Sequence, residues 1–289
     1  MQLRIPGRLK LKGRQLKNKW RELRWASVAS KRRTFVVRLQ PGLNMRLYGD
    51  SELCRLIYCC NFEATERAFL NHFLRPGDTF IDVGANIGLF TLIAATRVGR
   101  AGSVVAFEPT TTTHARLMDN VELNEFSNVN CMNLALSDHS GYVDLIQSTD
   151  GFDGWNSLAE PIAGKTFHKE PVEVIEWDRY AEEHDLIGRT TMMKIDVEGW
   201  ESRVLAGGKE VFNRTDAPLL QVEFADETAK AAGSSCRDLY QCLENFGYRM
   251  FVYNLAKRNL LPEPVREKYP YSNLIATKDP ESVNARLRT

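Results

Sequence analysis

The stretch Phe80-Ile81-Asp82-Val83-Gly84-Ala85-Asn86-Ile87-Gly88-Leu89-Phe90 decides the fold of this 289-residue chain. A short apolar run ends on an acid and continues into a turn with two glycines, and apolar residues then recur at helical spacing up to Val98. Gly84 and Gly88 permit backbone conformations and close approaches that a β-carbon would block. This pattern is typical of the strand, turn and helix that begin a nucleotide-binding βα unit.

The turn does not match the fingerprint of dinucleotide-binding proteins, which has glycine at its first, third and sixth positions. Those positions hold Gly84, Asn86 and Leu89, so only the first agrees. Asp82 would repel a pyrophosphate, but it suits a ligand that carries an ammonium and a sulfonium group. The turn therefore favours S-adenosylmethionine and disfavours an NAD(P)-dependent oxidoreductase.

A second acid follows at the end of the next strand. The run 103–107 is followed directly by Glu108, which stands 26 positions after Asp82. An acid at this place can accept hydrogen bonds from both ribose hydroxyls of a nucleotide. Further along, Ala135-Leu136-Ser137-Asp138 closes the third strand, where we expect the base of the nucleotide, with its adenine amino group donating a hydrogen bond to Asp138. As an alternative, Asp138 is only a turn acid.

Strands and helices alternate along most of the chain, which predicts a parallel sheet. We expect strands at 79–83, 103–107, 128–134, 191–197, 218–224, 249–253 and 273–277. The predicted fold class is α/β, a Rossmann-like, doubly wound and mostly parallel seven-stranded sheet with a small N-terminal extension of hairpin and helix. The predicted parts are a basic amphipathic arm 1–33, the hairpin and helix 34–76, a main domain 77–280 with an insertion at 141–189, and a tail 281–289.

The fourth expected strand carries charges where a parallel strand is normally apolar on both faces. Alternation places Lys194, Asp196 and Glu198 on one side. An unpaired buried charge costs several kcal/mol, so these residues form either an ion pair without chemistry or part of a reaction site. Because this strand end faces the crevice, we expect Asp196 to be a general base that Lys194 keeps ionised. Glu198 or Glu223 would position an acceptor or replace Asp196 as the base.

The insertion 141–189 interrupts the alternation and would overhang the crevice. Two strand-like runs in it enclose the segment 148–164, which contains glycines, aspartates and one tryptophan. Loops at such places often contact substrate, so Trp155, Asn156 and Ser157, together with Asp153, are candidate acceptor contacts, although each can equally be an ordinary loop residue. His139 and His168 lie beside or within the insertion and remain second choices for the base.

Residues 1–33 contain 12 Lys/Arg and one acid, so the arm carries +11 and the remainder carries 26 − 36 = −10. Leu16, Trp20 and Leu23 recur at helical spacing among these charges, which predicts a short basic amphipathic helix. Such a helix can lie on an anionic membrane, contact nucleic acid, or pack its apolar residues on its own domain. The sequence leaves these three interpretations open.

Composition and cysteine usage are those of an ordinary intracellular protein. No run reaches the roughly 18 apolar residues that span a bilayer, and the N-terminus lacks the apolar core of a signal peptide. We therefore expect a cytoplasmic protein whose arm is the part suited to peripheral membrane contact. The six cysteines show no C-x-x-C pairing, so neither a zinc site nor a disulfide framework is predicted, and no metal ligand is assigned.

Taken together, the motifs resemble the FkbM family of methyltransferases. The motifs are Asp82-Val-Gly-Ala-Asn-Ile-Gly88, Glu108-Pro109, Ala135-Leu-Ser-Asp138, Lys194-Ile-Asp-Val-Glu-Gly199 with Glu201, Val204-Leu205 and Gly207-Gly208, and Asn273-Leu-Ile-Ala276. The resemblance runs from about Glu63 to Lys278 and is most specific from Lys194 to Gly208. It implies the class I methyltransferase fold and S-adenosylmethionine-dependent O-methylation, commonly of sugar hydroxyls in glycans and glycolipids or of secondary metabolites.

The predicted cofactor contacts are Asp82, Gly84, Ala85, Asn86, Gly88, Glu108, Ser137 and Asp138. A nucleic-acid methyltransferase that uses the basic arm is the main alternative. Such enzymes hold an exocyclic amine with an Asn-Pro-Pro-Tyr type motif at the end of the fourth strand, where this chain has Asp196-Val197-Glu198-Gly199. Nucleic acid is therefore the less favoured acceptor. A non-catalytic interaction protein would require a pocket that binds nothing.

Overall fold

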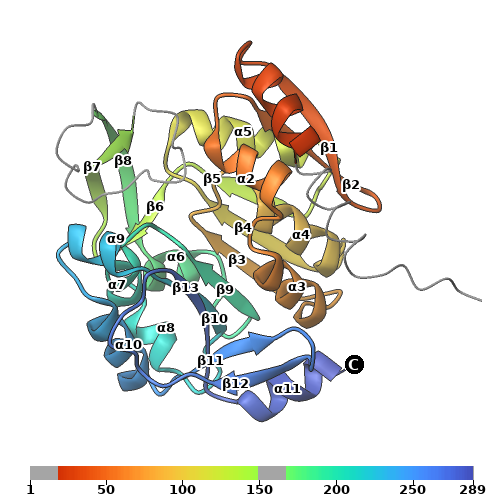
Figure 1. Ribbon diagram of the computed structural model, residues 1–289. Helices are drawn as coiled ribbons and strands as arrows, with labels where there is room; N and C mark the ends of the chain where they lie inside the picture. Colours follow the sequence, from red (N-terminus) through yellow and green to blue (C-terminus); the bar gives the residue numbers. More distant parts are fainter. Residues whose placement is uncertain (1–18, 149–166, 289) are drawn as a thin grey trace, which may run out of the picture.

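A computed structural model describes residues 19–148 and 167–288 (Figure 1). The candidate acceptor contacts Asp153, Trp155, Asn156 and Ser157 lie outside these residues, as does Leu16 of the arm.

The centre of the protein is an eight-stranded sheet with the order β12-β11-β13-β10-β9-β3-β4-β5. Its strands are β3 Thr79–Val83, β4 Ser103–Phe107, β5 Val129–Met132, β9 Met192–Ile195, β10 Leu219–Phe224, β11 Arg249–Asn254, β12 Asn259–Pro262 and β13 Ser272–Thr277. The strands from β10 to β5 are parallel, whereas β13, β11 and β12 are antiparallel to their neighbours. All seven predicted strands are present, and the predicted Rossmann-like α/β fold is confirmed. The eighth, β12, is a four-residue edge strand paired with β11, and it ends at a proline, which sequence patterns rarely reveal.

Alternating residues of each strand enter two different cores, because side chains on a strand point to opposite faces. Phe80, Met192 and Leu219 pack in one apolar cluster, whereas their neighbours in the chain pack in the other. The first cluster is covered by the helices within 52–98 and 280–288, and the second by the helices within 177–245 (Figure 1). The sheet is therefore doubly wound, as predicted.

The helices of the described residues include α2 Glu52–Cys60, α3 Ala64–Phe73, α4 Leu89–Val98, α5 Thr111–Leu123, α6 Trp177–Glu183, α7 Glu201–Ala206, α8 Lys209–Asn213, α9 Asp226–Ala231, α10 Cys236–Asn245 and α11 Pro280–Arg288. A further helix spans residues 19–29. Among the described residues, no helix is long and apolar enough to cross a bilayer.

A row of polar side chains crosses one face of the sheet near the carboxyl ends of its strands. Asp82 of β3 is in register with Lys194 of β9, which is in register with Gln221 of β10. Two residues later on β10, Glu223 is in register with Asn273 of the antiparallel strand β13. The two clusters around the row are apolar, so the polar residues are concentrated where ligands bind in open α/β sheets.

The predicted hairpin is present as β1 Thr34–Gln40 and β2 Leu43–Tyr48. It is held against α5, because the side-chain amides of Asn120 and Asn124 bond to the backbone of Arg46 and Asn44. The chain then forms α2, which no sequence pattern indicated, and α3, the helix expected within 34–76. These contacts make the extension part of the wall of the main domain.

Residues 135–138 and the tail differ from the sequence expectation, whereas the two strand-like runs expected in the insertion are present. Residues 135–137 do not close the third strand of the main sheet, but form β6 Ala135–Ser137 of a separate sheet with β7 Gly141–Ser148 and β8 Phe167–Glu176, in the order β6-β8-β7. Asn133 turns the chain by donating hydrogen bonds to the carbonyls of Glu108 and Pro109. Residues 281–288 continue α11, whose Leu287 is buried, so this segment packs on the domain as a helix.

The close approach between Gly84 and the backbone of Asp196 leads to a first prediction. A β-carbon on Gly84 would lie 1.9 Å from the carbonyl oxygen of Asp196, and Gly84 has a φ of +79°. Gly77 has a similar φ of +92° but nothing within 4 Å of such a carbon, so it is a matched control. We expect Gly77→Ala to cost about 1–2 kcal/mol of unfolding free energy, and Gly84→Ala to cost about 2–5 kcal/mol because strain and overpacking add. Urea unfolding measures both, and equal losses would contradict the prediction.

Candidate functional site

A cavity of about 230 Å³ opens at the carboxyl ends of β3, β4, β9 and β10. Most of the predicted site residues line it, namely Gly84, Ala85, Asn86, Glu108, Lys194, Asp196, Glu198 and Glu223. The opposite wall comes from α2 and from the residues just before α3, including Leu56 and Phe62. The predicted cofactor turn and the predicted catalytic strand therefore share one cavity.

The glycine turn is held in its conformation by β4. The backbone N–H groups of Gly84 and Ala85 both donate to the carbonyl oxygen of Phe107. Gly84, Asn86 and Gly88 all have positive φ values, 79°, 49° and 94°, which glycine adopts freely and asparagine tolerates better than most residues. The turn thus presents its backbone to the cavity, close to the end of β4.

Glu108 is buried at the end of β4, and both of its carboxylate oxygens accept hydrogen bonds. Oε2 accepts from the N–H of Asn86 at 3.0 Å, and Oε1 accepts from the N–H and the hydroxyl of Thr110 at 3.1 and 2.6 Å. Because a carboxylate oxygen can accept more than one hydrogen bond, these contacts orient Glu108 and still allow it to accept from a ligand hydroxyl. The geometry suits its predicted role at a ribose.

Asp82 and Gly88 lie behind the cavity wall instead of lining it. Asp82 is fully buried and accepts a hydrogen bond of 2.6 Å from the hydroxyl of Thr91 in α4. Burial raises its pKa, and the positive charge of Lys194 opposes this. A β-carbon on Gly88 would lie 2.7 Å from the side chain of Leu117, so this glycine serves packing between α4 and α5. Asp82 can influence a ligand only through neighbours such as Lys194.

Ser137 and Asp138 also lie outside the cavity lining. Asp138 forms an ion pair of 2.8 Å with Arg203 and accepts hydrogen bonds from Ser137 and His139. Their neighbours Ala135 and Leu136 line the cavity instead, because β6 leaves the main sheet and turns its apolar residues inward. A contact between Asp138 and adenine stays a prediction that this arrangement does not favour. The second-choice base His139 faces this surface network, and His168 is in β8.

Lys194 and Asp196 form the predicted ion pair, with 2.6 Å between Nζ and Oδ2. The lysine side chain is 3% exposed and the aspartate 19%, so the pair joins the buried row to the cavity. The ammonium also lies 4.7 Å from the ring centre of Phe90. Burial alone would lower the pKa of Lys194, but the charges of Asp196, Asp82 and Glu63 raise it overall, so the lysine stays protonated.

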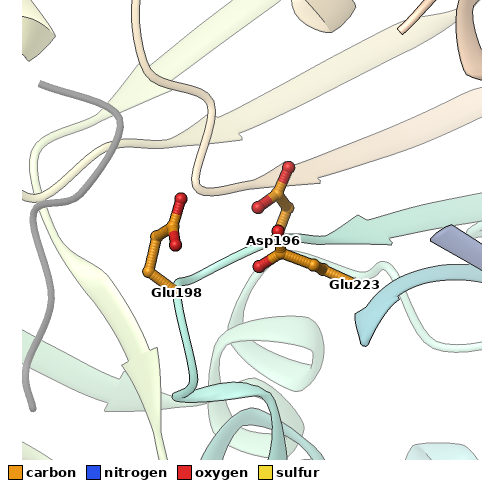
Figure 2. Close-up of side chains that lie close together, drawn as sticks. All are labelled: Asp196, Glu198 and Glu223. Carbon is orange, nitrogen blue, oxygen red and sulfur yellow. The ribbon is translucent and has the colours of Figure 1, made fainter. Parts of the chain in front are cut away.

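Asp196, Glu198 and Glu223 form a cluster in which carboxylate oxygens of all three lie within 4.8 Å of one another. Figure 2 shows Glu223 reaching from β10 toward the end of β9, where the other two lie. Burial, followed by the charge of Asp196, raises the pKa of Glu198 and of Glu223 well above the usual value. The cluster therefore concentrates acidic groups whose ionisation depends on a nearby positive charge.

The turn after β9 aims these acids into the cavity. Glu198 and Gly199 have positive φ values of 52° and 98°, and a β-carbon on Gly199 would lie 2.3 Å from the carbonyl oxygen of Thr228. Glu201 stabilises the turn because its Oε1 accepts the N–H groups of Val197 and Gly199 at 3.0 and 3.2 Å. Burial raises the pKa of Glu201 to about 7. The sequence analysis noted Glu201 in a motif but gave it no role.

Glu63 and Tyr271 line the cavity, although the sequence analysis did not assign them to the site. The Tyr271 hydroxyl donates to Oε1 of Glu63, and the Asn273 amide donates to the same oxygen at 3.2 Å. Burial raises the pKa of Glu63 to about 7. The two residues are far apart in the chain, and no local pattern marks either one. In the sequence, Glu63 was marked only because the resemblance to the FkbM family begins near it.

Comparison with known proteins finds methyltransferases among the relatives of this chain. Methyltransferase 1 of Beauveria bassiana (strain ARSEF 2860) is 29% identical over 148 residues, which are 46% of this chain, and the chain spans 59% of that protein's length. Among solved structures, SMU.1697c of Streptococcus mutans, in complex with SAH, is 10% identical at a TM-score of 0.43, with 73% of this chain and 94% of that chain covered. Methyltransferase FkbM from Methylobacillus flagellatus KT is 16% identical at a TM-score of 0.41, with 77% and 54% covered.

The strand order and the doubly wound sheet of the chain itself identify its fold, and the family comparison agrees with it. Residues 82–250 match the family model described as the methyltransferase FkbM domain. This match covers more than half of the 289 residues, and it includes the glycine turn, Glu108 and the turn after β9. The chain belongs to the FkbM family of methyltransferases.

Proposed function

We propose that this protein transfers the methyl group of S-adenosylmethionine to a hydroxyl group, which belongs to a sugar of a glycan or glycolipid or to a secondary metabolite. The observation that carries the proposal is the ion pair of Lys194 and Asp196, which stands in the same cavity as the glycine turn and Glu108. This arrangement puts a positioned carboxylate next to the place where a methyl donor would bind.

The residues of the cavity suit this cofactor in charge and in shape. Glu108 can accept from ribose hydroxyls, and the turn around Asn86 lies beside it. The acids of the cavity favour the positive sulfonium and ammonium groups and disfavour phosphates. Gly84 allows the turn to touch the backbone of Asp196, where a β-carbon would collide. When bound, S-adenosylmethionine supplies an electrophilic methyl group.

The chemistry needs alignment and a proton acceptor. An acceptor oxygen forms a bond to the methyl carbon while the carbon–sulfur bond breaks, so much of the rate comes from holding the reacting atoms in line. The hydroxyl proton must leave, and Asp196 can take it as a general base. Lys194 holds one oxygen of this carboxylate in an ion pair of 2.6 Å and so orients it. The products are a methyl ether, S-adenosylhomocysteine and a protonated carboxyl group that returns its proton to water.

The two rival functions fit the cavity less well. An NAD(P)-dependent oxidoreductase would place a pyrophosphate near the turn, and a nucleic-acid methyltransferase would bring phosphodiesters close to Asp196, Glu198 and Glu223. Both put negative charge beside clustered carboxylates, which is unfavourable at low effective dielectric. The nucleic-acid alternative keeps one supporting feature, the basic arm.

We further propose that the protein is cytoplasmic and docks peripherally on an anionic membrane through residues 1–33. In the described part of the arm, Trp20 and Leu23 are 72% and 60% exposed, so they do not pack on the domain. Trp25 is buried against Phe35 and Tyr58 and anchors the helix. Exposed apolar side chains among basic residues are the feature that interfacial helices use to enter a lipid headgroup layer.

Binding of S-adenosylhomocysteine tests the cofactor site. We expect Glu108→Ala to weaken it by about 1–3 kcal/mol in calorimetry, because hydrogen bonds to a charged group are lost. Glu170→Ala is a matched control. Oε1 of Glu170 accepts hydrogen bonds from the N–H and the hydroxyl of Thr111, much as Glu108 accepts from Thr110. Glu170, however, lies outside the cavity lining. The control should bind normally. Preferential binding of NAD by the unmodified protein would refute the cofactor assignment.

Turnover tests the role of Asp196. Mass spectrometry of glycan and lipid extracts treated with the enzyme should first reveal an acceptor by the gain of one methyl group. Asp196→Asn should then lower kcat by at least about 100-fold, a typical general-base contribution, while S-adenosylhomocysteine still binds. Asp185→Asn, at an exposed acid paired with Arg189, should behave as wild type. Full activity of Asp196→Asn would remove Asp196 from the mechanism, and loss of cofactor binding would make its role structural.

Sedimentation with vesicles tests the arm. The full chain should bind vesicles that contain phosphatidylserine at low salt and bind less at high salt, since each basic residue near the surface adds about 1 kcal/mol. Replacing Trp20 and Leu23 by alanine should weaken binding at constant charge, whereas Leu255→Ala, at another exposed apolar residue, should not. Equal binding after removal of residues 1–33 would disprove membrane docking, and binding only to RNA would support the rival interpretation.

A further inference from the structure

Among the described residues, three carboxylates from two adjacent strands surround one point of the cavity. Asp196 and Glu198 follow β9, Glu223 is the last residue but one of β10, and their oxygens lie within 4.8 Å of one another (Figure 2). Two oxygens on opposite sides of one ion are about 4.2 Å apart around Mg²⁺ and about 4.6–5.2 Å apart around Ca²⁺. The separations therefore fit one coordination sphere or require only small side-chain movements.

Glu223 provides an independent sign that something binds here. Glu223 is 3% exposed, and its Oε2 has no hydrogen-bond partner among the described residues. Buried polar atoms without a partner are rare, and each one calls for an explanation such as a bound ion or a ligand. The carboxylate of Glu223 points toward the carboxyl end of β9, where Asp196 and Glu198 lie.

The charge balance of the cavity leads to the same result. Lys194 is the one basic residue among the side chains that line the cavity in the described structure. The acids that line it are Glu52, Glu63, Glu108, Asp196, Glu198 and Glu223. Like charges at close range in a buried site are unfavourable, and a cation of higher charge than one ammonium would relieve their repulsion.

We propose that Asp196, Glu198 and Glu223 bind a divalent metal ion of the Mg²⁺ or Mn²⁺ class. A set of oxygen ligands without cysteine or histidine suits these hard cations and does not suit zinc. The remaining coordination positions face the cavity and are open to water or to an acceptor oxygen. The proposal departs from the sequence analysis, which assigned no metal ligand.

The metal site has a consequence for the proposed methyl transfer, and only this consequence rests on that function. A hydroxyl group bound to a divalent cation would have a lowered pKa, so it would release its proton to water more easily. With the ion in place, Asp196 acts as a ligand, and the cation performs part of the work that the metal-free mechanism gives to a general base. Lys194 remains the second positive charge that holds Asp196.

Manganese binding to the full chain tests the site without any acceptor. After treatment with EDTA and dialysis, the protein is titrated with Mn²⁺ and the free ion is measured by electron paramagnetic resonance, with and without S-adenosylhomocysteine. We expect one ion per chain, displaced by excess Mg²⁺. Glu223→Gln should weaken binding at least about 10-fold, since loss of even an outer-shell partner costs 10- to 100-fold. Glu267→Gln, an exposed acid outside the cavity lining, is the matched control and should bind as wild type.

The outcomes separate the two proposals. Absence of Mn²⁺ binding under both conditions, or equal binding by Glu223→Gln and the wild type, would overturn the metal site. If Glu223→Gln does not fold, as judged by circular dichroism, Glu198→Gln at a half-buried position replaces it with the same expectation. Binding of Mn²⁺ without methylation of any acceptor would leave the metal site intact and contradict the proposed function.

Discussion

A single buried ammonium group, that of Lys194, sets the charge balance of the polar row and of the cavity. It lies at the centre of the polar row on the sheet, in register with Asp82 and Gln221, and it bonds to Asp196 at 2.6 Å. Without it, the carboxylates on this face would have no positive partner on the sheet, and burial would favour their neutral forms. The ion pair thus balances one of the carboxylates that gather at the end of β9, where oxygens of Asp196, Glu198 and Glu223 lie within 4.8 Å of one another.

The second constraint is the close contact between the two halves of the site. Gly84 of the turn touches the backbone of Asp196, and the N–H of Asp196 bonds to the carbonyl of Val83 at 3.1 Å. The turn that would hold the cofactor and the strand end that carries the acids are consequently one rigid unit. Glu108 is tied to the same unit through Asn86. Small changes in the backbone here would alter cofactor binding and catalysis together.

The sequence by itself determined seven of the eight strands of the main sheet and the glycine turn. It also determined the residues of this turn and of the strand ends that line the cavity. Short apolar runs separated by helical segments specify parallel strands, because each run must be buried on both faces. The acids at or near the ends of such runs, Glu108, Asp196 and Glu223, necessarily lie close to the carboxyl edge of the sheet. Period-two alternation also placed Lys194 beside Asp196. All of these features follow from local patterns of a few residues.

Only the tertiary structure decided which polar residues reach the cavity. Asp82 bonds to Thr91 behind the wall, and Asp138 pairs with Arg203, although both stand at positions that a strand pattern assigns to the site. Conversely, Glu63 joins the site from the start of α3 through Tyr271, a residue that lies 208 positions away in the chain. Local patterns specify the edge and the face of a sheet on which a side chain lies. The partner that satisfies a buried charge depends on packing between segments far apart in sequence, which no local pattern contains.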